Sequence, residues 1–190
     1  MMTVRQIERL WEAKAYGRLM EQLLDARPES SPRAAAELKG AVPAAAMAVI
    51  RLEELGQDHA PVARSLLNLI LATQESDGGW SDPMVTALCL RALLCGRGRG
   101  VAIERGMAHL AELQRDDGSW PAIPVRRAGG DAMTTAFILQ QLADQPAFAA
   151  RAQVEMAMGW LGEREAQLDG DARRLWSAAR VKYQFLPLAA

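Results

Sequence analysis

One seven-residue pattern occurs twice in this chain. Residues 74–80 read QESDGGW and residues 114–120 read QRDDGSW, so Gln74, Asp77, Gly78 and Trp80 recur 40 residues later. Each copy follows an apolar stretch with helical spacing. A repeat of about 40 residues with helical content is typical of stacked helical hairpins, whose neighbours bury each other's apolar faces. We therefore predict an all-α fold.

A second copied element follows each of these turns. Residues 82–90 read DPMVTALCL and residues 131–139 read DAMTTAFIL, at an offset of 49 residues instead of 40. The additional residues lie in the segment after Trp120. Asp82 and Asp131 begin the copied stretches, where a carboxylate accepts hydrogen bonds from the first amides of a helix. We expect both residues to be helix N-caps.

Helical spacing and the positions of proline and glycine predict helices along the whole chain. The expected ranges are 3–26, 34–40, 43–55, 61–74, 83–95, 101–114, 131–143, 146–161 and 171–184. We interpret residues 1–190 as a single helical domain, with an N-terminal helical segment at 1–27 and hairpin repeats over 34–184. Residues 158–165, MGWLGERE, resemble residues 107–114, MAHLAELQ, and indicate a degenerate third repeat.

The repeated residues have a structural explanation that requires no chemistry. A glutamine at a helix end can bond backbone groups that the helix leaves unpaired, while a tryptophan ring covers it from water. An Asp-Gly pair forms a tight turn, because glycine accepts backbone angles that other residues resist. We assign this structural role to Gln74, Asp77, Gly78, Trp80, Gln114, Asp117, Gly118 and Trp120.

Composition argues against several classes of function. The net charge of −1 and pI near 6.2 show no basic footprint for nucleic acid. The longest mostly apolar stretch, 41–50, is too short to span a bilayer, and the N-terminus lacks the apolar core of a signal peptide.

Cys89 and Cys95 are expected to be reduced thiols, so we predict a cytoplasmic protein. His59 and His109 lack a metal-binding partner at close spacing, and we expect no metal and no cofactor.

The pattern Gln-x-x-Asp-Gly-(Gly/Ser)-Trp after an apolar helix resembles the QW motif of the superfamily of squalene–hopene cyclases and protein prenyltransferases. The resemblance is firm over residues 61–142 and weak elsewhere. It implies an α/α toroid, in which inner and outer helices alternate around a central cavity. A full toroid needs more helices than this sequence supplies. We therefore expect an incomplete or open arc, or a ring closed by a second chain.

The resemblance also identifies what the chain lacks. Class II terpene cyclases protonate an alkene with the middle aspartate of Asp-x-Asp-Asp-Thr-Ala, and the frame of that motif occurs here twice. Met84 and Met133 stand at the protonating position in the two copies. Methionine has no proton to donate, so this reaction is not expected. Asp131 is the one candidate for a catalytic carboxylate, and its alternative role is that of a helix cap.

Two kinds of function remain open from the sequence. The first is a non-catalytic interaction or accessory protein of this superfamily, with a protein partner or a second copy of the chain. The second is a divergent enzyme or binding protein for an isoprenoid or another apolar small molecule. In that case the residues expected to line an apolar cavity are Met84, Met133, Thr135 and Trp160; otherwise the methionines and Trp160 are ordinary core residues.

Overall fold

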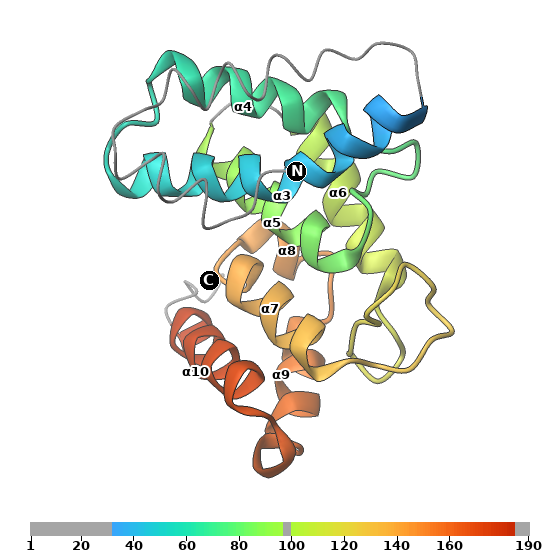
Figure 1. Ribbon diagram of the computed structural model, residues 1–190. Coiled ribbons are helices and arrows are strands. Elements are labelled where there is room, and N and C mark those ends of the chain that lie inside the picture. Colours follow the sequence, from blue (N-terminus) through green and yellow to red (C-terminus); the bar gives the residue numbers. More distant parts are fainter. Residues whose placement is uncertain (1–31, 97–99, 185–190) are drawn as a thin grey trace. The chain divides into compact units, whose positions relative to one another are not determined.

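The computed structural model describes residues 32–96 and 100–184, and this part of the chain is helical (Figure 1). An isolated bridge between Pro121 and Gly130 is the only β-type pairing there. This confirms the all-α prediction, whereas the expected segment 1–27 lies outside the described residues. The helices are α3 (Pro32–Glu54), α4 (Pro61–Ala72), α5 (Pro83–Cys95), α6 (Gly100–Leu113), α7 (Ala132–Leu142), α8 (Pro146–Ala149), α9 (Val154–Gly162) and α10 (Gly170–Gln184), with a short 3₁₀ helix η1 (Glu165–Gln167) before α10.

The described residues divide into two compact units. The first contains residues 32–74 and 91–96, and the second contains residues 75–90 and 100–184. Helix α5 contributes its first two turns to the second unit and its end to the first. The expectation of a single domain stays a prediction. None of the described helices combines the length and apolar character that crossing a bilayer requires.

In the first unit, α3 packs against α4, and the predicted break at 40–43 is absent. Helix α3 runs through Gly40 and Pro43 without interruption. Proline removes one helical hydrogen bond, but its fixed φ is compatible with a helix. The residues around it are buried at 5% exposure or less, namely Val42, Ala44, Ala45 and Ala46. The prediction of two helices was wrong, and we infer that burial of this apolar face outweighs the lost bond.

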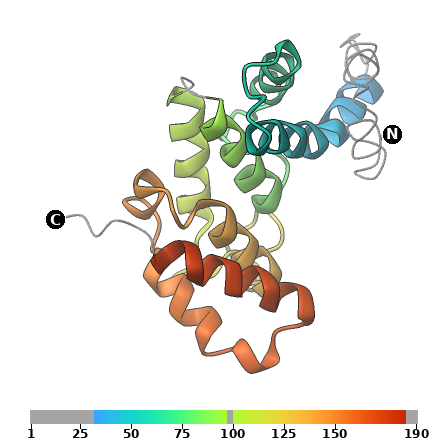
Figure 2. The same cartoon turned by 90° about the vertical axis from the view of Figure 1, so that its left-hand side faces the viewer.

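In the second unit, α7 packs against α10 and α9, the orange and red helices of Figure 2. The predicted helix 146–161 is wrong in one respect, because it is divided into α8 and α9. The carbonyl of Gln153 still accepts a helical bond, from the N–H of Ala157 at 3.1 Å, whereas its own N–H lies before the first turn of α9. The side-chain amide of Gln114 bonds both groups, at 2.8 and 3.2 Å. A partner distant in sequence therefore supplies the acceptor for the Gln153 N–H and a second donor for its carbonyl.

The two turn glycines approach the backbone of a helix in the next repeat. Gly78 has φ +95° and Gly118 has φ +85°. A Cβ added to Gly78 would lie 2.6 Å from the carbonyl oxygen of Arg105 in α6. A Cβ added to Gly118 would lie 2.7 Å from the backbone nitrogen of Ala157 in α9. The two turns thus contact α6 and α9 in equivalent ways, as expected if α9 belongs to a third repeat.

Substitution of Gly118 tests this packing. We expect Gly118→Ala to lower the free energy of unfolding by about 2–5 kcal/mol, because the methyl group combines a left-handed φ with a backbone clash. Gly159→Ala is the matched control within α9, since nothing lies within 4 Å of its added Cβ. That change should stabilise the helix by roughly 0.5–1 kcal/mol. Denaturant titration followed by circular dichroism measures both, and equal effects would contradict the proposed close approach.

Candidate functional site

The two repeated turns, at residues 74–80 and 114–120, have the same backbone geometry. The N–H of Glu75 donates to the carbonyl of Gly79 at 2.9 Å, and Arg115 donates to Ser119 at the same distance. In each turn the aspartate accepts from the amide two residues later: Asp77 from Gly79 at 2.9 Å, and Asp117 from Ser119 at 3.1 Å. The repeated letters therefore correspond to a repeated three-dimensional turn.

A threonine connects each turn to the helix that follows it. The hydroxyl of Thr86 accepts from the N–H of Trp80 at 2.9 Å and donates to the carbonyl of Asp82 at 2.9 Å. The hydroxyl of Thr135 accepts from the N–H of Trp120 at 3.0 Å and donates to Asp131 at 2.7 Å. Both threonines are fully buried. Their use in the turn was not predicted, although both occupy the same position of the copied element.

The two aspartates before these helices are N-caps, as predicted. Oδ1 of Asp82 accepts from the N–H of Val85 at 2.9 Å. Oδ1 of Asp131 accepts from both the N–H and the hydroxyl of Thr134, each at 2.7 Å. Asp131 is half-buried at the start of α7. The candidate acid thus already has a structural function.

Gln114 and Trp120 hold the second turn from two sides. The side chain of Gln114 is buried and donates to the carbonyl of Gly118 at 2.8 Å, in addition to its two bonds with Gln153. The indole N–H of Trp120 donates to the carbonyl of Leu110 at 2.7 Å. The Trp120 ring is fully buried and stacks on Phe148 with 6.1 Å between centroids. In the first copy, Trp80 is likewise buried, and Gln74 is half-buried at the end of α4.

His109 and the two cysteines are the residues in the described chain whose types most often serve as nucleophiles or metal ligands. His109 is buried, and its Nδ1 lies 3.6 Å from Oδ2 of Asp77. Within the described residues, no group of three or more His, Cys, Asp or Glu side chains lies close enough together to hold a metal ion. Cys89 and Cys95 are free thiols. Burial raises the pKa of both thiols, which favours the protonated form over the nucleophilic thiolate.

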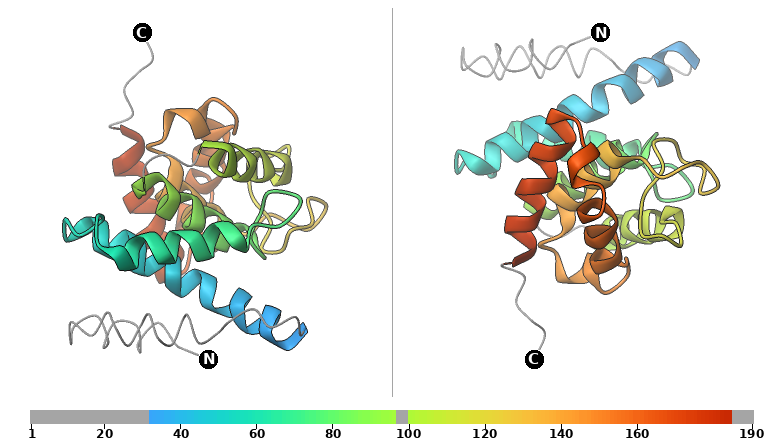
Figure 3. Two further views of the ribbon diagram at one scale, coloured as in Figure 1. Left: turned by 90° about the horizontal axis from the view of Figure 1, so that it is seen from above. Right: turned by 90° about the horizontal axis from the view of Figure 1, so that it is seen from below.

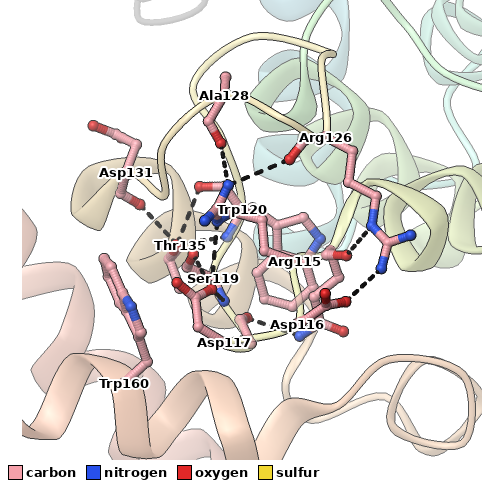
Figure 4. Close-up of polar contacts among 12 residues, drawn as sticks. Arg115, Asp116, Asp117, Ser119, Trp120, Arg126, Ala128, Asp131, Thr135 and Trp160 are labelled. Carbon is pink, nitrogen blue, oxygen red and sulfur yellow. Dashed lines mark hydrogen bonds and ion pairs between the residues drawn. The ribbon is translucent and has the colours of Figure 1, made fainter.

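The residues proposed to line a cavity occupy two kinds of position. Met84 and Met133 are the second residues of α5 and α7, and both are half-buried. The hydroxyl of Thr135 is already hydrogen-bonded to the backbone of Trp120 and Asp131. Trp160 is half-buried. The guanidinium group of Arg164 lies over its ring, at a distance of 4.3 Å from the ring centre. Figure 4 places Trp160 close to Ser119 and Thr135. A cavity bounded by these residues stays a prediction.

The loop after Trp120 is attached to the same turn by two arginines (Figure 4). Arg115 donates from Nη1 to the carbonyl oxygens of Arg126 and Ala128. Arg126 donates from Nε to the carbonyl of Gln114 at 3.0 Å and from Nη2 to Asp116 at 2.7 Å. The sequence analysis did not identify these contacts, because they join residues 10 to 13 positions apart without a recognisable motif.

Comparisons with known proteins do not supply a family for this arrangement. No protein-family model, curated protein or solved structure matches the chain. The resemblance to the cyclase and prenyltransferase superfamily therefore depends on the repeated residues quoted above.

Removing one hydroxyl tests the link between turn and helix. We expect Thr135→Val to lower the free energy of unfolding by about 1–3 kcal/mol, because the buried N–H of Trp120 loses its acceptor without a change in side-chain shape. Thr86→Val should have a similar effect at the equivalent position. Ser177→Ala removes an exposed hydroxyl that bonds within α10 and should change stability by less than about 0.5 kcal/mol. The three variants are compared by denaturant titration.

Acid titration tests the network around Asp117. Burial raises its pKa, but two hydrogen bonds from Ser119 and the charge of Arg115 outweigh that effect, so the pKa lies below its ordinary value of 3.8. A lowered folded-state pKa stabilises the protein above the unfolded value, and this contribution is lost as the pH falls through the folded value.

The corresponding variant is Asp117→Asn. Its stability should fall furthest below that of the wild type above about pH 4, and the difference should narrow as the pH falls towards about 2. Melting temperatures between these pH values measure the difference. Glu112→Gln, at an exposed position of α6, is the control for the removal of one negative charge. A difference for Asp117→Asn that does not change with pH would contradict the assignment.

Proposed function

We propose that this chain is a non-catalytic member of the α/α-toroid superfamily and acts as an interaction or accessory protein. One observation carries the proposal: at both copies of the cyclase-like frame, the carboxylate that remains caps a helix. Asp82 and Asp131 accept bonds from Val85 and Thr134, and the protonating positions hold Met84 and Met133. A catalytic acid has to be poised to lose its proton to the substrate, whereas these carboxylates serve as acceptors.

The alternation of helices supports the toroid part of the proposal. Helices α6 and α9 lie at equivalent positions of the repeat, each against a turn glycine of the preceding repeat. Helices α5 and α7 each begin after a capping aspartate and a QW-type turn. The helices that follow a capped turn, α5 and α7, thus alternate along the chain with the helices that contact a turn glycine, α6 and α9. An open α/α arc requires two alternating sets of helices. The retained turns and the absent acid together favour a scaffold whose role is binding.

A product assay distinguishes this proposal from a divergent cyclase. The purified full chain is incubated with squalene and with geranylgeranyl diphosphate, and products are sought by gas chromatography and mass spectrometry. We expect none, under conditions in which a squalene–hopene cyclase gives product. Asp131→Asn is the diagnostic variant, because asparagine also caps helices and the melting temperature should hold. Turnover that disappears in this variant would contradict the proposal.

Native mass spectrometry addresses the alternative of a small-molecule binder. Protein isolated from its own cells should carry no stoichiometric isoprenoid or other lipid. A lipid adduct that survives purification and is reduced by Met133→Asp would favour the binding-protein alternative. Met84 and Met133 are the residues on which that alternative depends, since both are half-buried at equivalent helix starts.

A further inference from the structure

The contact between the second turn and α9 differs in one side chain from the equivalent contact of the first turn. A Cβ added to Gly78 would lie 2.6 Å from the carbonyl oxygen of Arg105 in α6. A Cβ added to Gly118 would lie 2.7 Å from the carbonyl carbon of Met156 in α9, which is orange in Figure 3. The alignment of residues 158–165 with 107–114 pairs the same two positions, since 158 − 107 and 156 − 105 both equal 51.

Arg105 attaches the first turn to α6 by hydrogen bonds. Its Nη2 donates to the carbonyls of Glu75 and Ser76, at 3.0 and 2.9 Å. The thioether of Met156 has no proton to donate. Its Cγ, to which the sulfur is bonded, would lie 2.9 Å from a Cβ on Gly118. The methionine side chain therefore contributes apolar packing to the second contact, where the arginine contributes charged hydrogen bonds to the first.

Met156 is also the most exposed methionine among the described residues. It is 46% exposed, whereas Met47 is 37% exposed and Met107, on the equivalent helix α6, is 1% exposed. The other described methionines are half-buried, namely Met84, Met133 and Met158. A peroxide has to reach the sulfur in order to oxidise it, so oxidation should begin at Met156.

We infer that Met156 is a site of reversible oxidation, and that its sulfoxide weakens the contact between the second turn and α9. The sulfur attacks one oxygen of hydrogen peroxide, so that an S–O bond forms and the O–O bond breaks. The departing hydroxide takes up the remaining proton and leaves as water; the methionine is oxidised and the peroxide is reduced. The inference is independent of the proposed function, because it concerns the chemistry of one packing contact.

The sulfoxide cannot replace the bonds that Arg105 makes in the first copy. Its oxygen accepts hydrogen bonds, and the equivalent groups of the second turn, the carbonyls of Arg115 and Asp116, are acceptors as well. A polar S=O group packed against the turn loses hydration and gains no bond from these carbonyls, which costs free energy. If the group turns to solvent instead, the side chain leaves the turn. Either arrangement removes the apolar packing on Gly118.

Peroxide treatment of the full chain tests the inference. Purified protein is exposed to increasing concentrations of hydrogen peroxide. Peptide mass spectrometry measures the fraction of each methionine that gains one oxygen, and fragmentation separates Met156 from Met158. We expect Met156 to be oxidised before every other described methionine. Its oxidation should lower the melting temperature by about 2–4 °C, and should speed hydrogen exchange of the amides in α9 but not in α6.

Two conservative variants and one enzymatic reaction serve as controls. Met156→Leu removes the sulfur but keeps an apolar side chain of similar volume, so it should melt like the wild type before treatment and lose the peroxide-induced shift. Met47→Leu, on α3, should retain the shift. Treatment of the oxidised wild type with methionine sulfoxide reductases for both epimers, with dithiothreitol as the reductant, should restore the melting temperature.

Several results would overturn the inference. One is oxidation of Met84, Met133 or Met158 at lower peroxide concentrations than Met156. A second is a shift that persists in Met156→Leu, because it would belong to another residue. A third is unchanged hydrogen exchange of α9 in the wild type oxidised at Met156, a measurement that requires no variant. A melting temperature that the reductases do not restore would contradict reversibility.

Discussion

The repeat architecture depends on the close approach of one glycine in each turn to the backbone of a helix in the next repeat. At Gly78 and Gly118 even a methyl group would meet backbone atoms at 2.6–2.7 Å. Such an approach requires a residue without Cβ that also accepts a positive φ, and only glycine meets both conditions at little cost. The turns therefore determine where α6 and α9 lie. In the second copy the side chains of Gln114 and Trp120 add hydrogen bonds to Gln153 and Leu110.

The same turns and helix starts hold the polar groups of the copied elements in hydrogen bonds. Asp82 and Asp131 cap helices, and Thr86 and Thr135 satisfy the backbone of the tryptophans. A buried polar group that is fully bonded stabilises the fold, but it cannot easily move a proton or bind a substrate. Residues 121–130 depart from the repeat, because the first copy lacks them, and they expose Ile123 and Val125.

Much of this arrangement could be predicted from single residues and short patterns. The two turns, the capping aspartates and the starts of α4, α5 and α8 at Pro61, Pro83 and Pro146 follow from local chemistry. Two predictions failed because tertiary contacts, of a different kind in each case, outweighed the local signal. The sequence around Pro43 indicated a break, and residues 146–161 indicated one continuous helix. In the first case burial overrode a local signal, and in the second Gln114 supplied bonds from a distant part of the chain.

By itself, the sequence determined the helical class, the repeat and the identity of the residues in each turn. These properties follow from interactions between residues that are close in sequence, namely helix capping and the helical spacing of apolar residues. Only the tertiary structure decided which helix each turn contacts, that Thr135 bonds the Trp120 backbone, and that Arg115 and Arg126 attach the loop 121–130 to the second turn. These contacts join residues 10 to 39 positions apart. No local rule specifies them, because packing selects one partner among many that the chain makes available.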